Sequence, residues 1–271
     1  IFNCCLINIK DMLDNGTVMN GKLIESPKSF QVACTVMTQI ISAVASSQYG
    51  GQSVDLKHLG KYLRKSHDKY EKAYRAHFGD EFDDDTIEKL VQDRLKDELK
   101  SGVQTIQYQI NTLMTTNGQS PFVTLFLNLD ENNEYIEENA MIVEEILRQR
   151  LEGIKNEKGV WITPAFPKLI YVLDEDNITE DSKYWYLTEL AAKCTDYISA
   201  KIMKELKKGE VYPCMGCRSF LTVEDSQMLP NGKHKFYGRF NQGVVTINLV
   251  DVACSAEGDM DRFWQILDER L

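Results

Sequence analysis

The chain has 271 residues, 43% of them hydrophobic and 10% aromatic, a composition typical of a globular protein and not of a disordered one. Its formal net charge of −10 argues against a broad nucleic-acid-binding surface. No apolar run reaches the ~18 residues of a membrane-spanning helix, and residues 1–9 lack the features of a signal peptide. Seven cysteines favour a reducing compartment over a disulfide framework. We therefore expect a cytoplasmic protein that binds neither nucleic acid nor a membrane.

Apolar periodicity and turn residues predict the elements in chain order. Phe2 to Ile9 predicts a short buried strand. Ser26 and Pro27 predict the start of a helix, as N-cap and first helical residue. Residues 29–47 are apolar on more than one face, as in a helix that is buried or packs on a partner. The remaining elements are predicted as helices at 56–78 and 86–114, a strand at 121–129, a helix at 139–156, a strand at 166–173 and a helix at 187–208.

The order of these elements predicts the fold class. Strands that alternate with long helical connections are typical of an α/β sheet with parallel pairs. Residues 29–114 are then a mostly helical layer. The chain starts at Ile1 without Met and ends at Leu271 on a helix-like run, so we expect a piece of a longer protein.

Two segments near the C-terminal end point to chemistry. Met215-Gly216-Cys217-Arg218-Ser219 puts a thiol in a short non-periodic loop, and residues 238–249 run from a polar loop into an apolar strand. The glycine lets the backbone turn tightly beside the cysteine. A thiol that is held rigidly and shielded from solvent suits radical chemistry, whereas a buried structural cysteine is the default interpretation of the motif alone.

Further segments follow a known family in the same order along the chain. They are Phe2-Asn3-Cys4 with Leu6-Ile7, Ala45-Ser46-Ser47-Gln48-Tyr49-Gly50-Gly51, Asn111-Thr112-Leu113, Thr116 to Thr124, and Phe166-Pro167-Lys168-Leu169. With the Cys217 loop they resemble the anaerobic (class III) ribonucleoside-triphosphate reductases over nearly the whole chain. The resemblance implies a single catalytic fragment, residues 1–271, of a ten-stranded α/β barrel. It also implies a cysteine-bearing finger loop at 212–243 and a helical effector and dimerisation layer at 29–114.

The resemblance assigns roles to two cysteines. Cys217 matches the site of a thiyl radical that takes the 3′ hydrogen of a ribonucleotide, after which the 2′ hydroxyl leaves as water. Cys4 matches the opposing cysteine, which donates hydrogen to the substrate. Cys5 points to the other face of the strand and is interpreted as a core residue. Cys214 is either a bystander or a redox partner of Cys217, and their CxxC spacing alone is weak evidence for zinc.

Three polar residues complete the catalytic set that the resemblance implies. Asn3 and Asn241 match asparagines that hydrogen-bond near the sugar or the formate reductant, with a turn role as the alternative. Ser219 stands where aerobic reductases carry a glutamate base, so formate could fill that role.

Effector binding is implied at the helical layer. Glu25, Lys28 and Gln39 match positions where deoxynucleotides bind at a dimer interface, and Lys28 near a helix N-terminus would suit a phosphate. Ordinary capping and surface charge are the alternative interpretation. We predict no metal ligands in this chain.

The resemblance also names cofactors and partners. It implies a glycyl radical and zinc in a C-terminal segment of the Arg-x-Cys-Gly-Tyr type, formate as co-substrate, and deoxynucleotide or ATP effectors. The expected partners are a ribonucleoside triphosphate, a second copy of the chain, and a radical-SAM iron–sulfur activating enzyme. Neither the radical segment nor an ATP-binding cone lies within residues 1–271, so the chain alone is expected to be inactive.

Two alternatives stay open at the level of sequence. One is another glycyl-radical enzyme related to pyruvate formate-lyase, although Cys217 has no adjacent cysteine. The other is a non-catalytic nucleotide-binding dimerisation module. A downstream Arg-x-Cys-Gly-Tyr segment would refute the second alternative.

Overall fold

The computed structural model describes residues 3–48, 50–79, 81–116, 118, 120–129, 134–164, 166–194, 198–202, 238–241 and 247–271. The strands are β1 (Cys4–Leu6), β2 (Thr17–Met19), β3 (Lys22–Ile24), β4 (Gln52–Asp55), β5 (Val123–Leu127), β6 (Ile154–Lys155), β7 (Trp161–Ile162), β8 (Lys168–Leu173), β9 (Ile198–Ile202) and β10 (Arg239–Asn241). The helices are α1 (Ile9–Asp14), α2 (Phe30–Ala45), the 3₁₀ helix η1 (Leu56–Leu59), α3 (Gly60–Phe78), α4 (Asp84–Thr112), α5 (Ile136–Glu152), α6 (Trp185–Lys193), α7 (Leu249–Ala256) and α8 (Met260–Arg270). Residues 1–241 form one compact unit and 242–271 a second.

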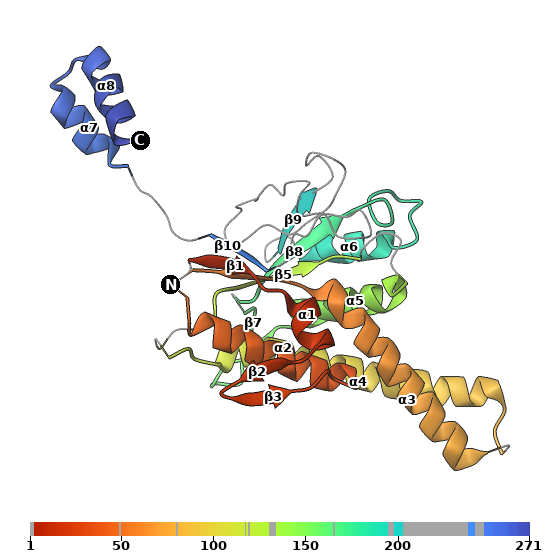
Figure 1. The fold of residues 1–271 in the computed structure, drawn as a ribbon. Coiled ribbons are helices and arrows are strands. Elements are labelled where there is room, and N and C mark those ends of the chain that lie inside the picture. The colour runs from red at the N-terminus through yellow and green to blue at the C-terminus, as the bar shows by residue number, and fades with distance from the viewer. Residues whose placement is uncertain are drawn as a thin grey trace. The chain divides into compact units, whose positions relative to one another are not determined.

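A six-stranded sheet forms the centre of the first unit, in the order β10-β1-β4-β5-β8-β9 (Figure 1). Neighbouring strands from β1 to β9 run parallel, and β10 pairs antiparallel with β1. The long connections between the parallel strands carry the helices, as parallel pairing requires. Helices α2, α4 and α5 lie together on one side of the sheet (Figure 1). This architecture confirms the predicted α/β class with parallel pairs.

Both faces of the sheet are buried, and they differ in what covers them. Leu125 and Leu169 belong to the main hydrophobic core with the helices, and Cys5 packs against that core. Leu6 and Phe126 are also buried but lie outside that core. Because side chains alternate along a strand, these residues define a second face. Parallel sheets are typically covered on both faces.

A glycine lets helices α2 and α4 approach closely. A Cβ added at Gly102 of α4 would lie 2.5 Å from Cε1 of Phe30 and 3.2 Å from Sγ of Cys34 on α2. The side chain of Gln31 adds a polar contact, since its Nε2 donates to Oγ1 of Thr105 at 2.9 Å. The two helices therefore pack at a separation that only a residue without a side chain permits at position 102.

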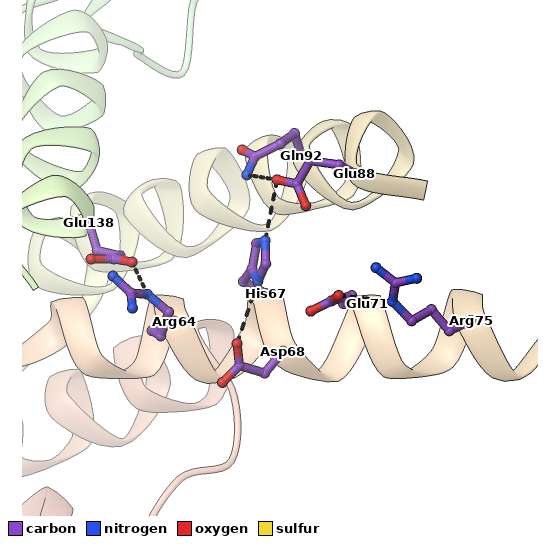
Figure 2. Close-up of polar contacts among 8 residues, drawn as sticks. All are labelled: Arg64, His67, Asp68, Glu71, Arg75, Glu88, Gln92 and Glu138. Carbon is purple, nitrogen blue, oxygen red and sulfur yellow. Dashed lines mark hydrogen bonds and ion pairs between the residues drawn. The ribbon is translucent and has the colours of Figure 1, made fainter. Parts of the chain in front are cut away.

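Polar contacts fix α3 against its neighbours (Figure 2). Arg64 of α3 forms an ion pair with Glu138 of α5. His67 Nε2 lies 3.4 Å from Oε1 of Glu88 on α4, and Gln92 donates to the same carboxylate at 2.8 Å. The hydrogen bond from Gln92 and then the contact with His67 lower the pKa of Glu88. Glu138 is buried, whereas Glu88 is exposed, so the contact with Glu88 contributes little to stability.

The loop that leads into β8 is held by side chains from two helices. Arg150 of α5 is buried and donates to the carbonyl oxygens of Pro164, at 2.6 Å, and of Pro167. Asn111 of α4 donates to the carbonyl oxygen of Phe166 at 2.8 Å. Burial lowers the pKa of the Arg150 guanidinium to about 10. The backbone that precedes Lys168 is thereby fixed from the helical side.

The second unit contains a pair of helices. Asn248 caps α7 by accepting from Val250 N at 3.1 Å, and Asp259 caps α8 by accepting from Asp261 N at 2.9 Å. Arg270 of α8 forms an ion pair with Asp251 of α7. None of the helices within the described ranges is long and apolar enough to cross a membrane.

The structure corrects several predicted boundaries. The N-cap of α2 is Ser29, whose side chain accepts from the N–H of Val32, so the predicted start at Ser26 and Pro27 was wrong. The predicted helix at 187–208 ends at Lys193, and β9 follows, because β-branched residues there pair with β8. The strand β4, which pairs with β1 and β5, was not predicted. The short helix α1 and the hairpin β2-β3 were not predicted.

We predict that Gly102→Ala destabilises the protein by about 1–3 kcal/mol, because the added methyl overpacks the α2–α4 contact. Helix propensity alone would favour alanine by about 1 kcal/mol, so the two effects have opposite signs. Ser101→Ala, one residue away on the exposed side of α4, is the matched control and should be neutral or slightly stabilising. Thermal unfolding of both variants gives the comparison. Equal melting temperatures for the two variants would contradict the packing account.

Candidate active site

Cys4 lies at the start of β1, between β4 and β10. Its side chain is 9% exposed, and its Sγ accepts a hydrogen bond from the N–H of Gly51 at 3.3 Å. In the antiparallel pairing of β1 with β10, Cys4 is the register partner of Asn241. Side chains of register partners lie on the same face of a sheet. The register therefore brings the backbones of Cys4 and Asn241 together.

The turn before β4 encloses Cys4 tightly. The N–H of Gly50 donates to the carbonyl oxygen of Asn3 at 2.5 Å. A Cβ at Gly50 would lie 2.5 Å from the Cys4 sulfur and would collide with the Asn3 carbonyl. Gln48 Nε2 donates to the carbonyl oxygen of Gly50 at 3.1 Å and so holds the turn. Glycine at 50 is thus required for the close approach of this turn to β1.

Cys5 has a different environment from Cys4. It packs against the helix-side core, and burial raises the pKa of its thiol from about 9 to about 11, with a smaller opposing effect from Gln48. A raised thiol pKa favours the neutral form, so Cys5 stays protonated at neutral pH. Cys4 and Cys5 therefore occupy opposite faces of the sheet.

Buried polar side chains also lie on the Cys4 face of strands β4 and β5. Ser53 and Asp55 of β4 and Thr124 of β5 are all buried, and they alternate with apolar residues of the helix-side core. Asn128 Nδ2 donates to Oδ2 of Asp55 at 3.2 Å in a buried contact. Buried polar side chains at every second position are the signal by which sequence reasoning could have found this face. Sequence reasoning missed Asp55 because β4 was not recognised as a strand, whereas Asn128 lay within the predicted strand at 121–129 and was given no role.

Several predicted catalytic residues lie outside the described residues or are described only in part. Cys217, Ser219 and Cys214 fall outside, so their roles stay predictions. The backbone of Asn241 is described and its side chain is not. Within the part of the chain that is described, no group of three or more His, Cys, Asp or Glu side chains is arranged to hold a metal ion.

The predicted effector residues are exposed but do not form one cluster. Glu25 and Lys28 lie in the segment between β3 and α2, whereas Gln39 lies in the middle of α2. Nine residues separate Phe30 from Gln39, which places Gln39 about 14 Å along the helix from its start. A ligand that contacts all three residues at once must therefore be about as long as a nucleotide.

The N-terminus of α2 is already satisfied by protein groups. The N–H of Phe30 donates to Oγ of Ser66 at 2.8 Å, and the N–H of Gln31 donates to Oε1 of Glu98 at 2.9 Å. The next N–H donates to Oγ of Ser29 at 3.5 Å. A carboxylate at this position also offsets the positive end of the helix dipole. The α2 backbone is therefore not available to a phosphate, which removes the argument that the helix N-terminus would help Lys28 to bind one.

A pocket of about 360 Å³ lies beside this helix start, between α2, α3 and α4. Its lining includes Lys69, Tyr70 and Arg94, and Arg94 stacks over the Tyr70 ring at 5.7 Å. The Tyr70 hydroxyl donates to Oε2 of Glu98 at 2.8 Å. Burial, and then the contact with Glu98, raises the pKa of Tyr70 to about 12. Sequence reasoning missed this group because its members come from two separate helices, α3 and α4.

The whole chain is similar to one family of known proteins. A family model described as anaerobic ribonucleoside-triphosphate reductase matches residues 1–271. The chain is 36% identical over 280 residues to the anaerobic ribonucleoside-triphosphate reductase of Escherichia coli strain K12, covering 100% of this chain and 37% of that protein. It is 35% identical over 286 residues to the enzyme of the same name from phage T4, covering 99% of this chain and 44% of the relative. The chain thus spans less than half of these relatives.

Solved structures agree at the level of fold. The anaerobic ribonucleotide reductase from Thermotoga maritima in complex with dATP and CTP superposes with a TM-score of 0.65 at 16% identity. That match covers 100% of this chain and 43% of the other. A second structure of the same protein, with dATP bound in the specificity site, gives a TM-score of 0.62 at 15% identity.

We predict that Cys5 reacts with iodoacetamide at pH 8 at least ~100-fold more slowly than the exposed Cys254, because a pKa near 11 leaves little thiolate. Its rate should keep rising with pH up to about 11. Mass spectrometry with fragment ions that separate Cys4 from Cys5 measures the rates, under anoxic conditions. Labelling of Cys5 as fast as that of Cys254 would contradict the assigned face.

Proposed function

Because the chain belongs to the anaerobic ribonucleoside-triphosphate reductase family, we propose that it forms part of the catalytic body of such an enzyme. The reaction is the reduction of ribonucleoside triphosphates to 2′-deoxyribonucleoside triphosphates without oxygen. The observation that carries the proposal is the match of the family model along all 271 residues. The polar, buried face around Cys4 supports it, because the reaction needs a thiol enclosed beside hydrogen-bonding groups.

The proposed architecture is a ten-stranded barrel of which the six-stranded sheet is one part, with residues 212–243 as the finger loop. The burial of the Cys4 face supports this arrangement, since an open sheet would leave that face in solvent. In the barrel the loop would bring Cys217 opposite Cys4. Asn3 and Asn241 would then lie beside the sugar, and the register pairing of Asn241 with Cys4 supports this placement.

In the proposed reaction, two thiols act in different steps. Cys217, as a thiyl, takes the 3′ hydrogen atom of the ribose, and the 2′ hydroxyl leaves as water. Cys4 donates a hydrogen atom to the 2′ carbon, its thiol is restored with hydrogen from formate, and Cys217 finally returns the 3′ hydrogen and becomes a thiyl again. Formate supplies the two electrons of the net reduction and leaves as carbon dioxide. Ser219 adds no carboxylate to the loop, which leaves room for the negative charge of formate.

The Cys4 environment fits such a role. Its sulfur accepts an N–H from the Gly51 backbone, a neutral donor that orients the thiol without adding charge. A glycyl radical, proposed on a segment outside this chain, supplies the unpaired electron that Cys217 uses. A radical-SAM iron–sulfur enzyme is the proposed source of that radical, and zinc is proposed only for the same outside segment. We propose a cytoplasmic location, in keeping with the seven cysteines.

The helical layer is proposed as a homodimer interface that binds deoxynucleotide or ATP effectors. Val32, Gln39 and Ala43 are exposed on α2 at spacings of seven and four, so they share one side of the helix. Tyr108, exposed on α4, adds an aromatic group to the layer. Self-complementary helix surfaces of this kind favour two-fold pairing. Glu25, Lys28 and Gln39 remain the proposed effector contacts, spread over the length of a nucleotide.

The first test concerns the radical cysteine. In the complete protein with its radical installed, Cys217→Ser should lower deoxynucleotide formation at least ~1,000-fold, because a hydroxyl is a poor hydrogen-atom relay. Cys254→Ser, at an exposed position in α7, is the control and should keep wild-type turnover. Near-normal product formation by Cys217→Ser, measured with labelled ribonucleotide, would refute the proposed chemistry.

The second test concerns assembly. Ala43→Glu should weaken dimerisation at least ~10-fold, because it places a charge on the exposed side of α2. Nucleotide binding and pairing are linked, so the response to dATP in sedimentation should weaken in parallel. Ala73→Glu makes the same change at an exposed position on α3 and should leave pairing unchanged. Ala45 is buried and unsuitable for this test. Unaltered sedimentation of Ala43→Glu would remove α2 from the interface.

A further inference from the structure

The hydroxyl of Thr124 is a buried polar group without a hydrogen-bond partner among the described residues. The side chain is 1% exposed, and its Oγ1 neither donates nor accepts a hydrogen bond. Burying an unpaired hydroxyl destabilises a protein, so native structures rarely keep one without a reason. Valine has nearly the same shape and would avoid the cost. The hydroxyl is therefore left to pair with a group other than the described residues.

Thr124 lies on the Cys4 face of the sheet. Its two neighbours in β5, Val123 and Leu125, belong to the helix-side core, so the alternation of side chains puts Thr124 on the other face. In the register of the sheet, Leu6 of β1 is level with Ser53 of β4, and Ser53 is level with Thr124. Thr124 therefore lies two strands away from β1, level with Leu6. Leu6 is the next residue of β1 after Cys4 whose side chain lies on the same face. Strand spacing and rise put the Cα atoms of Cys4 and Thr124 roughly 12 Å apart.

The next strand adds a positive charge at the same level. Lys168 of β8 is the register partner of Thr124, so its side chain shares the Cys4 face. Its ammonium makes no ion pair or hydrogen bond with the residues that the structure describes. The backbone before it is fixed by Arg150 and Asn111. A hydroxyl and an ammonium, both available and side by side on rigid strands, are the donors that suit an anionic oxygen.

The nearest carboxylate on this face does not compete for the position. Asp55 is the next residue of β4 after Ser53 whose side chain lies on the Cys4 face. Its Oδ2 accepts from Asn128, and its Oδ1 accepts from the N–H of Lys57 at 3.1 Å. Both carboxylate oxygens of Asp55 thus accept hydrogen bonds from other groups of the protein.

We propose that Thr124 and Lys168 bind a phosphate group of the ribonucleotide substrate. The Thr124 hydroxyl donates to a phosphate oxygen, and the Lys168 ammonium offsets its charge. A sugar held beside Cys4 would carry its 5′ phosphates across the face toward these two residues. This inference rests on the proposed function, because it takes the Cys4 face as the place where the ribose binds.

The test measures binding and stability separately in the complete protein, without the radical and under anoxic conditions. Equilibrium dialysis with CTP and with cytidine, in the presence of dATP, compares the wild type with Thr124→Val and Thr124→Ser. We expect Thr124→Val to weaken CTP binding about tenfold or more while leaving cytidine binding unchanged. Thr124→Ser keeps the hydroxyl and should bind CTP like the wild type. Lys168→Met should weaken CTP binding and reduce its salt dependence.

Thermal unfolding without ligand provides the readout that a structural role would change. Thr124→Val should keep or raise the melting temperature, since it removes an unpaired hydroxyl. Thr38→Val is the matched control and should lower it, because the buried Thr38 hydroxyl donates to the carbonyl oxygen of Thr35 at 2.8 Å and also contacts Gln109.

Three results would overturn the proposal. They are unchanged CTP binding by Thr124→Val, an equal loss for CTP and cytidine, and a loss of stability or failure to fold comparable to Thr38→Val. A wild-type protein that binds none of the four ribonucleoside triphosphates would instead overturn the proposed function, and the phosphate site with it.

Discussion

The alternation of side chains along β1 is the constraint on which the rest of the site depends. The strand is held on both sides, by β4 in parallel and by β10 in antiparallel register. Its two adjacent cysteines must therefore point to opposite faces. Cys5 enters the helix-side core, where burial raises the pKa of its thiol. Cys4 faces the polar side, next to the backbone of Asn241 and the N–H of Gly51.

Hydrogen bonds connect the helical layer to the loop that leads into β8. Arg150 and Asn111 project from α5 and α4 to hold the loop before β8. Because α4 packs on α2 through Gly102, a shift of α2 would be transmitted along α4 toward that loop. Such a path consists of packed helices and directed hydrogen bonds, which are the elements that carry coupling between sites.

Sequence patterns identified the fold class and the long elements well, for identifiable reasons. Helices α2 and α4 have enough turns for their apolar period to be recognised, and β5 and β8 are mostly apolar runs. The short strand β4 was missed because Gln52, Ser53 and Asp55 are polar residues that are buried only by tertiary contacts. The strand β9 was read as helix because its local sequence does not reveal its pairing with β8.

The candidate site was accessible from sequence in part. The resemblance implied that Cys4 and Asn241 both act near the sugar, and the register of two strands far apart in the chain makes their backbones neighbours. Thr124 and Lys168 were within the matched segments but received no role, since only the register shows that they are neighbours. The same limit applies to Tyr70, Arg94 and Glu98, which three-dimensional packing brings to one pocket.

The central claim is that the Cys4 face of the sheet is the face on which the ribonucleotide reacts. A crystal structure of the complete protein, grown without oxygen with CTP and dATP, tests it most directly. The account predicts that the ribose lies between the sulfur atoms of Cys4 and Cys217, in contact with both. A ribose bound on the Cys5 face, or a Cys217 sulfur that makes no contact with the sugar beside Cys4, would contradict it.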